Sequence, residues 1–567
     1  MAAPARVHDL PHLHRVLAKG APAPEVERLC EDGWADPAGF RAALNDCLPQ
    51  LGHGRTKSLP GGPTDLYADL VERWLGRDAE AAWFPAEGRR LSYAVLHEQA
   101  TALAAAWQQA GAVPGQSVAL VLPTGEAFTV ALLAAFQLGM VASFVPPRGS
   151  GFVGRALRSL APDRVASHPR YGGWLGPFLE RLLPEGGAAG GIPSRAPSRS
   201  HAYAPGAPAL RLLSCFSAPA WTPAEVSAEA VLWGALRDGL FVYGLLPGER
   251  LALPDFDPLQ WQPHGLLSAL ASGAEWLELS GEALASVEGR ARFRPTVAGV
   301  TPRLRAQWMA GTAEYPGLRR FVKSPCEPYD WAAWDDFARH LLQHGGARGI
   351  NLVASAAAGG ALLFSVPPAA GADLSLVAVP GLAFMLEDFL GGGVPATGNT
   401  GVVRPLEGAE GSAPRVAVAR LPQGSTFGGV VEPPWHGRRY PAEAVEEVAR
   451  AVAGVREAVA WVQASPELLN ASLATLLCFA DVTGPAVDGA GLARAVEQAL
   501  AAQLGPEAVP SRVQVYALEP RRLPGGEVDP AWCRWQASGA GLQARARDGL
   551  FLELARARQW AGRLAEE

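Results

Sequence analysis

The region 66–147 alternates between helical and extended patterns, and this alternation constrains the fold more than any other feature of the chain. A long helical pattern, RLSYAVLHEQATALAAAWQQAG, ends at Gly111 and is followed by a short apolar strand, SVALVLP. The apolar stretch 128–145 approaches the length of a membrane helix, but its internal Gln and Gly favour a buried helix followed by a buried strand. Helices and strands in this order are typical of βαβ units around a parallel sheet that is covered on both faces.

Composition shifts divide the chain into five expected parts. Residues 1–60 carry short helical patterns and end in the breaker cluster SLPGGP, which indicates a helical appendage. Residues 61–430 are expected to form the large domain, in which 185–208 is dense in Gly, Ala, Pro and Ser and predicts a mobile loop. Residues 438–535 show an α+β pattern, and 536–567 form an amphipathic helix. The predicted fold class is α/β: a large N-terminal domain with parallel-sheet αβ layers plus a small α+β C-terminal subdomain.

Charge and cysteine usage exclude several classes of function. The chain has 49 basic and 55 acidic side chains and a net charge of −6, so nucleic acid is not an expected partner. The six cysteines are scattered without the paired spacing of a zinc site, and we expect no metal site. The N-terminus lacks the apolar core of a secretory signal. We therefore expect a cytoplasmic protein without a membrane span.

Lysine is scarce, and this restricts the chemistry further. Only three of the 49 basic residues are lysines, namely Lys19, Lys57 and Lys323. A Walker loop requires Gly-Lys-Ser/Thr so that the ammonium group reaches the β- and γ-phosphates, and this tripeptide is absent from the sequence. The sequence therefore excludes a P-loop NTPase.

The order of motifs between about residues 65 and 535 resembles the adenylate-forming superfamily, which includes acyl-CoA synthetases, peptide-synthetase adenylation domains and luciferases. The run 91–147 is similar to the family's N-terminal lobe, and PGLAFMLEDFLGGGVPATGNTGVVRP is similar to a later stretch of its large domain. YPAEAVEEVARAVAGVREAVAWV and VPSRVQVYALEPRRLPGGEVD resemble its mobile C-terminal subdomain. The positions that match the N-terminal motif are Ser92, Tyr93, Gly115, Leu122, Pro123, Gly139 and Pro146.

The family's nucleotide loop uses small residues, hydroxyl groups and a lysine to surround phosphates. The matching segment, 213–225, keeps hydroxyl groups at Ser214, Ser217 and Thr222. Its glycines are missing, and Ala224 or Glu225 stands at the place of the lysine. A carboxylate that faces a triphosphate repels it.

Three further family groups are missing. Ala357 stands at the place of the glutamate that binds Mg²⁺ in the family. The resemblance also implies an aspartate on the ribose hydroxyls, but none occurs between Asp388 and Asp481, and the stretch 391–411 is glycine-rich and turn-like. Glu527 stands at the place of the lysine that contacts the acyl-adenylate.

These losses predict a protein that has lost the activation chemistry of the family. One preorganised transition-state group is worth roughly 2.7–4 kcal/mol, so three losses cost about 8–12 kcal/mol if they add. The leading hypothesis is a pseudo-ligase that binds an acyl or aryl group, an acyl carrier protein or a partner ligase, with no cofactor. ATP and Mg²⁺ are expected only under the alternative described next.

Two alternatives stay open. In the first, the chain is an active acyl- or aryl-activating ligase that forms an acyl-adenylate with a site rebuilt from arginines. The candidates for that site, which must converge on one cleft, are Arg404, Arg438 and Arg439 with Glu407 or Glu432. In the second, the old acyl pocket supports a different transferase or hydrolase reaction on Cys215 or Ser217.

Overall fold

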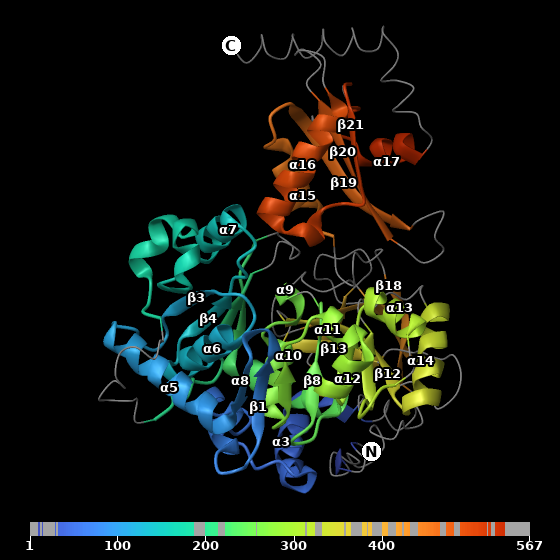
Figure 1. Ribbon diagram of the computed structural model, residues 1–567. Helices are drawn as coiled ribbons and strands as arrows, with labels where there is room; N and C mark the ends of the chain where they lie inside the picture. The colour runs from blue at the N-terminus through green and yellow to red at the C-terminus, as the bar shows by residue number, and fades with distance from the viewer. Residues whose placement is uncertain are drawn as a thin grey trace. The chain divides into compact units, whose positions relative to one another are not determined.

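The computed structural model describes residues 35–185, 199–213, 221–256, 258–311, 314–323, 331–356, 359–364, 377–382, 384–387, 400–405, 416–421, 424–430, 440–464, 472–480, 488–518, 520–522 and 528–538, with single positions between 10 and 33. The chain forms two compact units (Figure 1). The larger unit comprises Met1–Pro147 and Ala156–Glu432, and the smaller unit comprises Arg148–Arg155 and Pro433–Glu567.

The region 66–147 contributes to a mainly parallel sheet, as its alternating pattern predicts. The sheet consists, in spatial order, of β5 (Arg164–Ser167), β3 (Ser117–Val121), β4 (Val141–Phe144), β6 (Pro208–Leu212) and β7 (Ala224–Ser227). Only the pair of β6 and β7 is antiparallel. Helix α5 (Tyr93–Gln109) packs beside α6 (Glu126–Leu138), and every residue of α6 from Phe128 onward is buried. The stretch 128–145 is thus a buried helix followed by the buried strand β4.

A second, larger sheet crosses the same unit. Its strands are, in spatial order, β14 (Val377–Ala378), β13 (Gly360–Phe364), β12 (Arg348–Ser355), β11 (Arg320–Lys323), β10 (Val297–Val300), β8 (Arg250–Ala252), β9 (Glu275–Leu277), β1 (Glu80–Phe84) and β2 (Arg89–Ser92). The strands from β12 to β1 run parallel, and antiparallel strands border them on both sides. This arrangement confirms the predicted α/β fold class.

Helices of the larger unit connect and cover these strands. They are α3 (Pro37–Cys47), α4 (Leu66–Leu70), α8 (Ala228–Arg237), a π-helix (Asp238–Val242), α9 (Pro258–Trp261), α10 (His264–Ala271), α11 (Gly281–Ala285), α12 (Val287–Phe293), α13 (Pro302–Ala310) and α14 (Trp331–Gly345). Helix α7 (Ser150–Leu160) begins in the residues of the smaller unit and ends in those of the larger one.

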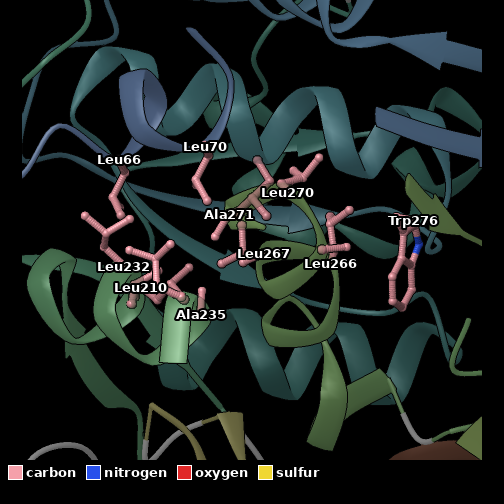
Figure 2. Packing of buried hydrophobic residues seen from close by; sticks show 14 of the residues in the cluster. Leu66, Leu70, Leu210, Leu232, Ala235, Leu266, Leu267, Leu270, Ala271 and Trp276 are labelled. Atoms are coloured by element: carbon pink, nitrogen blue, oxygen red, sulfur yellow. The ribbon is translucent and has the colours of Figure 1, made fainter. Parts of the chain in front are cut away.

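Helix α10 lies in the centre of the main hydrophobic core. Figure 2 shows Leu266, Leu267, Leu270 and Ala271 of α10 beside Leu66 and Leu70 of α4 and Leu232 and Ala235 of α8. Burial of one such leucine side chain is worth about 1.5–3 kcal/mol. The same helix carries a second, polar stripe, because His264, Ser268 and Ser272 recur at intervals of four residues and are also buried.

The remaining described strands of the larger unit pair in an antiparallel manner. A four-stranded sheet consists of β15 (Phe384–Glu387), β16 (Thr400–Pro405), β17 (Val416–Leu421) and β18 (Gly424–Val430), in that order. Strand β16 lies inside the stretch 391–411, which the sequence pattern predicts to be turn-like, so the prediction was wrong for this part. A strand of six residues with an internal glycine has too little apolar alternation to be recognised.

The segment 185–208 is described only at its two ends. Residues 186–198 lie outside the described residues. Near the other end, Tyr203 is buried, and its hydroxyl group donates a hydrogen bond to the carbonyl of Met140 at 2.8 Å. The backbones of Tyr203 and Thr64 also form an isolated β-bridge. The residues just before β6 are therefore anchored to the body of the larger unit.

The smaller unit follows the predicted α+β pattern. Its elements are α15 (Ala442–Arg450), β19 (Val455–Ala464), β20 (Ser472–Ala480), α16 (Gly489–Leu504), β21 (Arg512–Tyr516) and α17 (Pro530–Ser538). Strand β20 is central, antiparallel to β19 and parallel to β21. Helix α15 buries Ala444, Val445, Val448 and Ala449, the spacing of one helical face. The terminal helix expected over 536–567 lies almost entirely outside the described residues.

Candidate functional site

The parallel strands of the larger sheet define one edge at which a ligand site is expected. Strands β8, β10, β11 and β12 run in the same direction, so their carboxyl ends meet at the same edge. Open α/β sheets bind ligands outside these ends. The chain that leaves β8 leads to α9 and α10, and the chain that leaves β12 returns as β13. These connections therefore form the candidate site.

The predicted nucleotide-loop residues are only partly described. Ser214 and Ser217 lie outside the described residues, as does Cys215. Thr222 is exposed just before β7, and Glu225 lies on β7. Glu225 faces Arg211 of β6 as its register partner, and its Oε1 accepts hydrogen bonds from Nη2 and Nε of Arg211 at 2.5 and 3.1 Å. The carboxylate expected at the place of the family lysine is thus neutralised by its cross-strand neighbour.

Apart from Arg404, the other predicted site positions lie outside the described residues. Ala357 is the second residue after β12, and Glu527 falls within 523–527, between residues Arg522 and Val528 that form an isolated β-bridge. Arg404 belongs to β16, where the backbone alone is described. The remaining candidates of the arginine-based alternative, Arg438, Arg439, Glu407 and Glu432, also lie outside the described residues.

The two described lysines lie in contrasting surroundings. The ammonium group of Lys57 is exposed and lies 2.8 Å from the carboxylate of Glu72. Lys323 ends β11 with only 3% of its surface exposed, and its Nζ lies 5.5 Å from the ring centroid of Trp334. Lys19 lies outside the described residues.

A buried polar network that the sequence did not reveal lies where α8, α10 and β13 meet. Asp238, the first residue of the π-helix, is fully buried, and its Oδ2 lies 2.6 Å from Nε2 of His264. Its Oδ1 lies 2.6 Å from Nε of Arg237. The backbone N–H of Ala361 donates to Oδ2 at 2.6 Å, and Nη2 of Arg237 donates to the carbonyl of Ala361 at 2.9 Å. The network thus connects α8, α10 and β13.

The charge of Asp238 is maintained by its partners. Burial tends to raise the pKa of Asp238, but the positive charge of Arg237 and the hydrogen bonds from His264 and Arg237 outweigh that effect and hold the pKa below its usual value. Because an ionised carboxylate only accepts hydrogen bonds, Nε2 of His264 carries the proton in this contact. The contact with Asp238 therefore fixes the orientation of the imidazole ring.

Two backbone features accompany this network. π-helical turns are rare and occur frequently at functional sites, and this one begins at Asp238. Gly360 has φ of +119°, and a Cβ atom at this position would lie 2.4 Å from both Oδ2 of Asp238 and Nε2 of His264. The start of β13 therefore approaches the Asp238–His264 pair as closely as a glycine allows. The sequence does contain a sign of this polar network. His264, Ser268 and Ser272 form the run H-x-x-x-S-x-x-x-S, and such a polar stripe is unusual on a buried helix.

Two kinds of feature are absent from the described residues. They contain no group of three or more His, Cys, Asp or Glu side chains arranged to hold a metal ion. They also contain no helix that is both long enough and apolar enough to cross a membrane.

Sequence comparison relates part of the larger unit to known proteins. Residues 71–157 match the AMP-binding enzyme family. The chain is 30% identical over 287 residues to a Mycobacterium tuberculosis protein named salicyl-AMP ligase / salicyl-S-ArCP synthetase. That alignment covers 43% of this chain and 47% of the relative, so the chain matches about half the length of this curated relative.

Structural comparison extends over most of the chain. NpsA-ThdA, an artificially fused adenylation-PCP di-domain from Klebsiella oxytoca, superimposes with a TM-score of 0.63 at 16% identity, covering 80% of this chain and 94% of that one. The amide bond synthetase McbA from Marinactinospora thermotolerans also gives a TM-score of 0.63, at 19% identity, covering 83% and 99%. At such identities the likeness concerns the fold.

The chain therefore has the fold of the adenylate-forming enzymes, and its resemblance to that superfamily is confirmed. Members of this family are ATP-dependent acid ligases. The region that carries the resemblance most directly in sequence, 71–157, contains β1 to β4 with helices α5 and α6.

Proposed function

We propose that this chain is a binding protein built on the adenylate-forming fold, which holds an acyl or aryl group without efficient ATP-dependent activation. One observation carries the proposal: the family's groups for phosphate, Mg²⁺, ribose and the acyl-adenylate are missing at four separate places in the sequence. The pairing of Glu225 with Arg211 supports it, because a carboxylate held by a neighbouring arginine adds no positive charge toward a triphosphate. These residues do not fit ATP and Mg²⁺, and we propose that the protein uses no cofactor.

The ligand that we propose is an aromatic acid, either free or carried by a partner. The relative named salicyl-AMP ligase / salicyl-S-ArCP synthetase supports an aromatic acyl group and a carrier protein. The structural neighbour that joins an adenylation domain to a PCP domain supports the same kind of partner. A partner ligase is the other candidate, and a cytoplasmic location belongs to the same proposal.

Nucleotide binding tests the proposal without any assumption about the acid. The purified chain would be titrated calorimetrically with ATP and Mg²⁺ up to millimolar concentration, and pyrophosphate exchange would be followed with a panel of aromatic acids. We expect no saturable nucleotide binding and no exchange. Micromolar ATP affinity, or acyl-adenylate formation at the rates of ordinary ligases, would overturn the proposal.

One observation favours an active ligase as the second candidate: the relative matched at 30% identity bears the name of a ligase. This candidate requires Arg404, Arg438 and Arg439 to replace the family's lysines. Substitution of all three by glutamine would abolish acyl-adenylate formation if they form the site. Retention of that activity in the triple variant would exclude an arginine-based site.

A further inference from the structure

Three arginines lie together at the edge of the larger sheet where its parallel strands begin. Arg320 is the first residue of β11 and Arg348 is the first residue of β12, and the two are register partners. Register partners on neighbouring strands project from the same face of a sheet and lie about 4.8 Å apart. Arg319 directly precedes β11. This edge is opposite to the one where the carboxyl ends of the same strands form the candidate site.

Two of these arginines contact the segment that follows the π-helix. Nη1 of Arg320 donates a hydrogen bond to the carbonyl of Val242 at 3.1 Å. Nη2 of Arg319 donates to the carbonyl of Gly244 at 3.1 Å and also contacts the carboxylate of Glu249. Gly244 has φ of +64°, and a Cβ atom at this position would lie 2.5 Å from Cζ of Arg320. Both guanidinium groups therefore lie against the backbone at Gly244.

Each of the three guanidinium groups keeps a buried nitrogen without a partner. Nε of Arg319, Nη2 of Arg320 and Nη1 of Arg348 make no hydrogen bond with the residues that the structure describes. Arg320 is only 5% exposed. A buried charged donor that lacks an acceptor destabilises the folded state. An anion that accepts several hydrogen bonds at this place would remove that penalty.

The positive charge of these arginines is only partly balanced. Burial is the main cause that lowers the pKa of Arg320 to about 10, and the charges of Arg319 and Arg348 act in the same direction. Arg320 is therefore still charged at pH 7. The carboxylate that acts on it in the opposite direction is Glu249, which already contacts Arg319. Three guanidinium groups that share one carboxylate leave an excess of positive charge.

The excess charge and the number of unpaired donors match a phosphate group. A phosphate monoester carries a charge of about −1.5 to −2 at pH 7 and has three strong acceptor oxygens. The planar fork of a guanidinium group suits two such oxygens at once. Solvent reaches two of the three arginines, because the side chain of Arg319 is 36% exposed and Arg348 is half-buried. Arg320 forms the buried end of the cluster.

We propose that Arg319, Arg320 and Arg348 bind a phosphate group, as inorganic phosphate or as a small phosphate monoester, at the edge where β11 and β12 begin. The unpaired Nη2 of Arg320 binds the inner oxygen, and the two outer arginines bind the others. The site uses none of the groups on which the proposed function rests, so it does not depend on the binding of an aryl group.

Calorimetric titration of the full chain with inorganic phosphate, in a buffer without sulfate, nucleotide or Mg²⁺, tests the proposal. We expect saturable binding with a dissociation constant below about 1 mM. Arg348→Gln is expected to weaken phosphate binding about tenfold or more, because it removes a charged donor. The side chain of Arg348 makes no hydrogen bond or ion pair with other described residues, so this variant is expected to fold normally.

Glycerol 3-phosphate distinguishes the two sources of the phosphate group. An affinity similar to that of inorganic phosphate assigns the site to the phosphate of a larger molecule. An affinity that is about tenfold lower or weaker still assigns the site to the free ion, because the ester group then prevents entry.

Arg339→Gln is the matched control. It removes the same charge from an exposed arginine that bonds to Asp335 and Asp336 of its own helix, so its phosphate affinity should equal that of the wild type. Absence of saturable binding up to about 10 mM phosphate would overturn the inference. Equal phosphate affinity of Arg348→Gln and the wild type would overturn it as well. Either result would leave the proposed function standing, because that function is tested with ATP and aromatic acids.

Discussion

Arg90 on β2 and Glu275 on β9 form a bidentate ion pair across strand β1. Nε and Nη2 of Arg90 lie 2.6 and 2.9 Å from Oε1 and Oε2 of Glu275, which is 2% exposed. Nε of Arg250 on β8 donates to the same carboxylate at 2.9 Å. One buried carboxylate therefore ties together four neighbouring strands of the larger sheet, β8-β9-β1-β2.

Glu275→Ala is expected to lower the free energy of unfolding by about 3 kcal/mol, because it takes from Arg90 and Arg250 the buried carboxylate that they share. Urea unfolding followed by tryptophan fluorescence measures this loss. The control is Asp335→Ala, which removes an exposed i,i+4 partner of Arg339 and is expected to cost less than about 1 kcal/mol. Equal losses in the two variants would contradict the structural importance of Glu275.

Gly360→Ala is expected to destabilise the larger unit by about 1–3 kcal/mol more than Gly359→Ala. Both glycines have positive φ, +119° and +78°, so both substitutions carry backbone strain. Only the Cβ at position 360 meets Asp238 and His264 at 2.4 Å, whereas position 359 has its nearest neighbours at 3.9 Å. The difference between the urea unfolding midpoints of the two variants measures the destabilisation caused by contact of the new Cβ atom with Asp238 and His264. Equal midpoints would mean that β13 shifts away at no cost.

The larger unit is expected to lose stability as the pH falls from 7 to 5. Burial, with the nearby charges of arginines, lowers the pKa of His14 to about 4 and that of His53 to about 3. The unfolded chain therefore binds more protons than the folded chain below pH 6.5, and stability is lost as the pH decreases through this range. Each histidine contributes about 2 kcal/mol to the loss.

Burial is the largest cause of both pKa shifts, and the charged groups near these histidines act in the same direction. Arg319 and Arg320 act on His14, and Arg73 and Arg77 act on His53. Urea midpoints at pH 7 and pH 5 measure the effect, and His53→Phe is expected to remove about half of it. A midpoint that does not change between these pH values would show that both histidines are protonated without penalty in the folded protein.

Restoring lysines at the two expected positions is predicted not to restore activation. In Glu225→Lys, Glu527→Lys and the double variant, the Mg²⁺ and ribose groups of the family are still missing. Each missing group costs roughly 2.7–4 kcal/mol of transition-state stabilisation. Hydroxamate formation from an aromatic acid with ATP and Mg²⁺ measures activation directly. Activity in a single-lysine variant would show that the other groups are supplied elsewhere in the chain.

The sequence predicted those elements of the fold that depend on residues close together in the sequence. The stretch 128–145 was correctly divided into helix and strand because a glycine, Gly139, interrupts its apolar residues and adopts φ of +74° at the end of α6. The order of elements in the smaller unit followed from periodicity in the same way. Strand β16 was missed because its pairing with β15 and β17, rather than its own residues, makes it a strand.

The candidate site was less accessible to sequence reasoning. Asp238 and His264 are 26 positions apart, and Ala361 is 123 positions from Asp238. Each looks ordinary in its own segment, and the contact exists only because α8, α10 and β13 pack together. The predicted site residues instead came from matching motifs, and of these the structure describes Thr222 and Glu225 in a defined setting.

The different exposure of Lys57 and Lys323 allows local opening of the folded chain to be measured by chemical modification of its lysines. An amine-directed reagent meets an exposed ammonium group at Lys57, with 62% of the side chain accessible, and a buried one at Lys323. The rate of modification at Lys57 therefore reports the intrinsic reactivity of the reagent. The rate at Lys323 reports how often the end of β11 opens. With so few amines to resolve, peptide mass spectrometry would follow both sites in one sample, and the ratio of the two rates would measure local opening in the native protein.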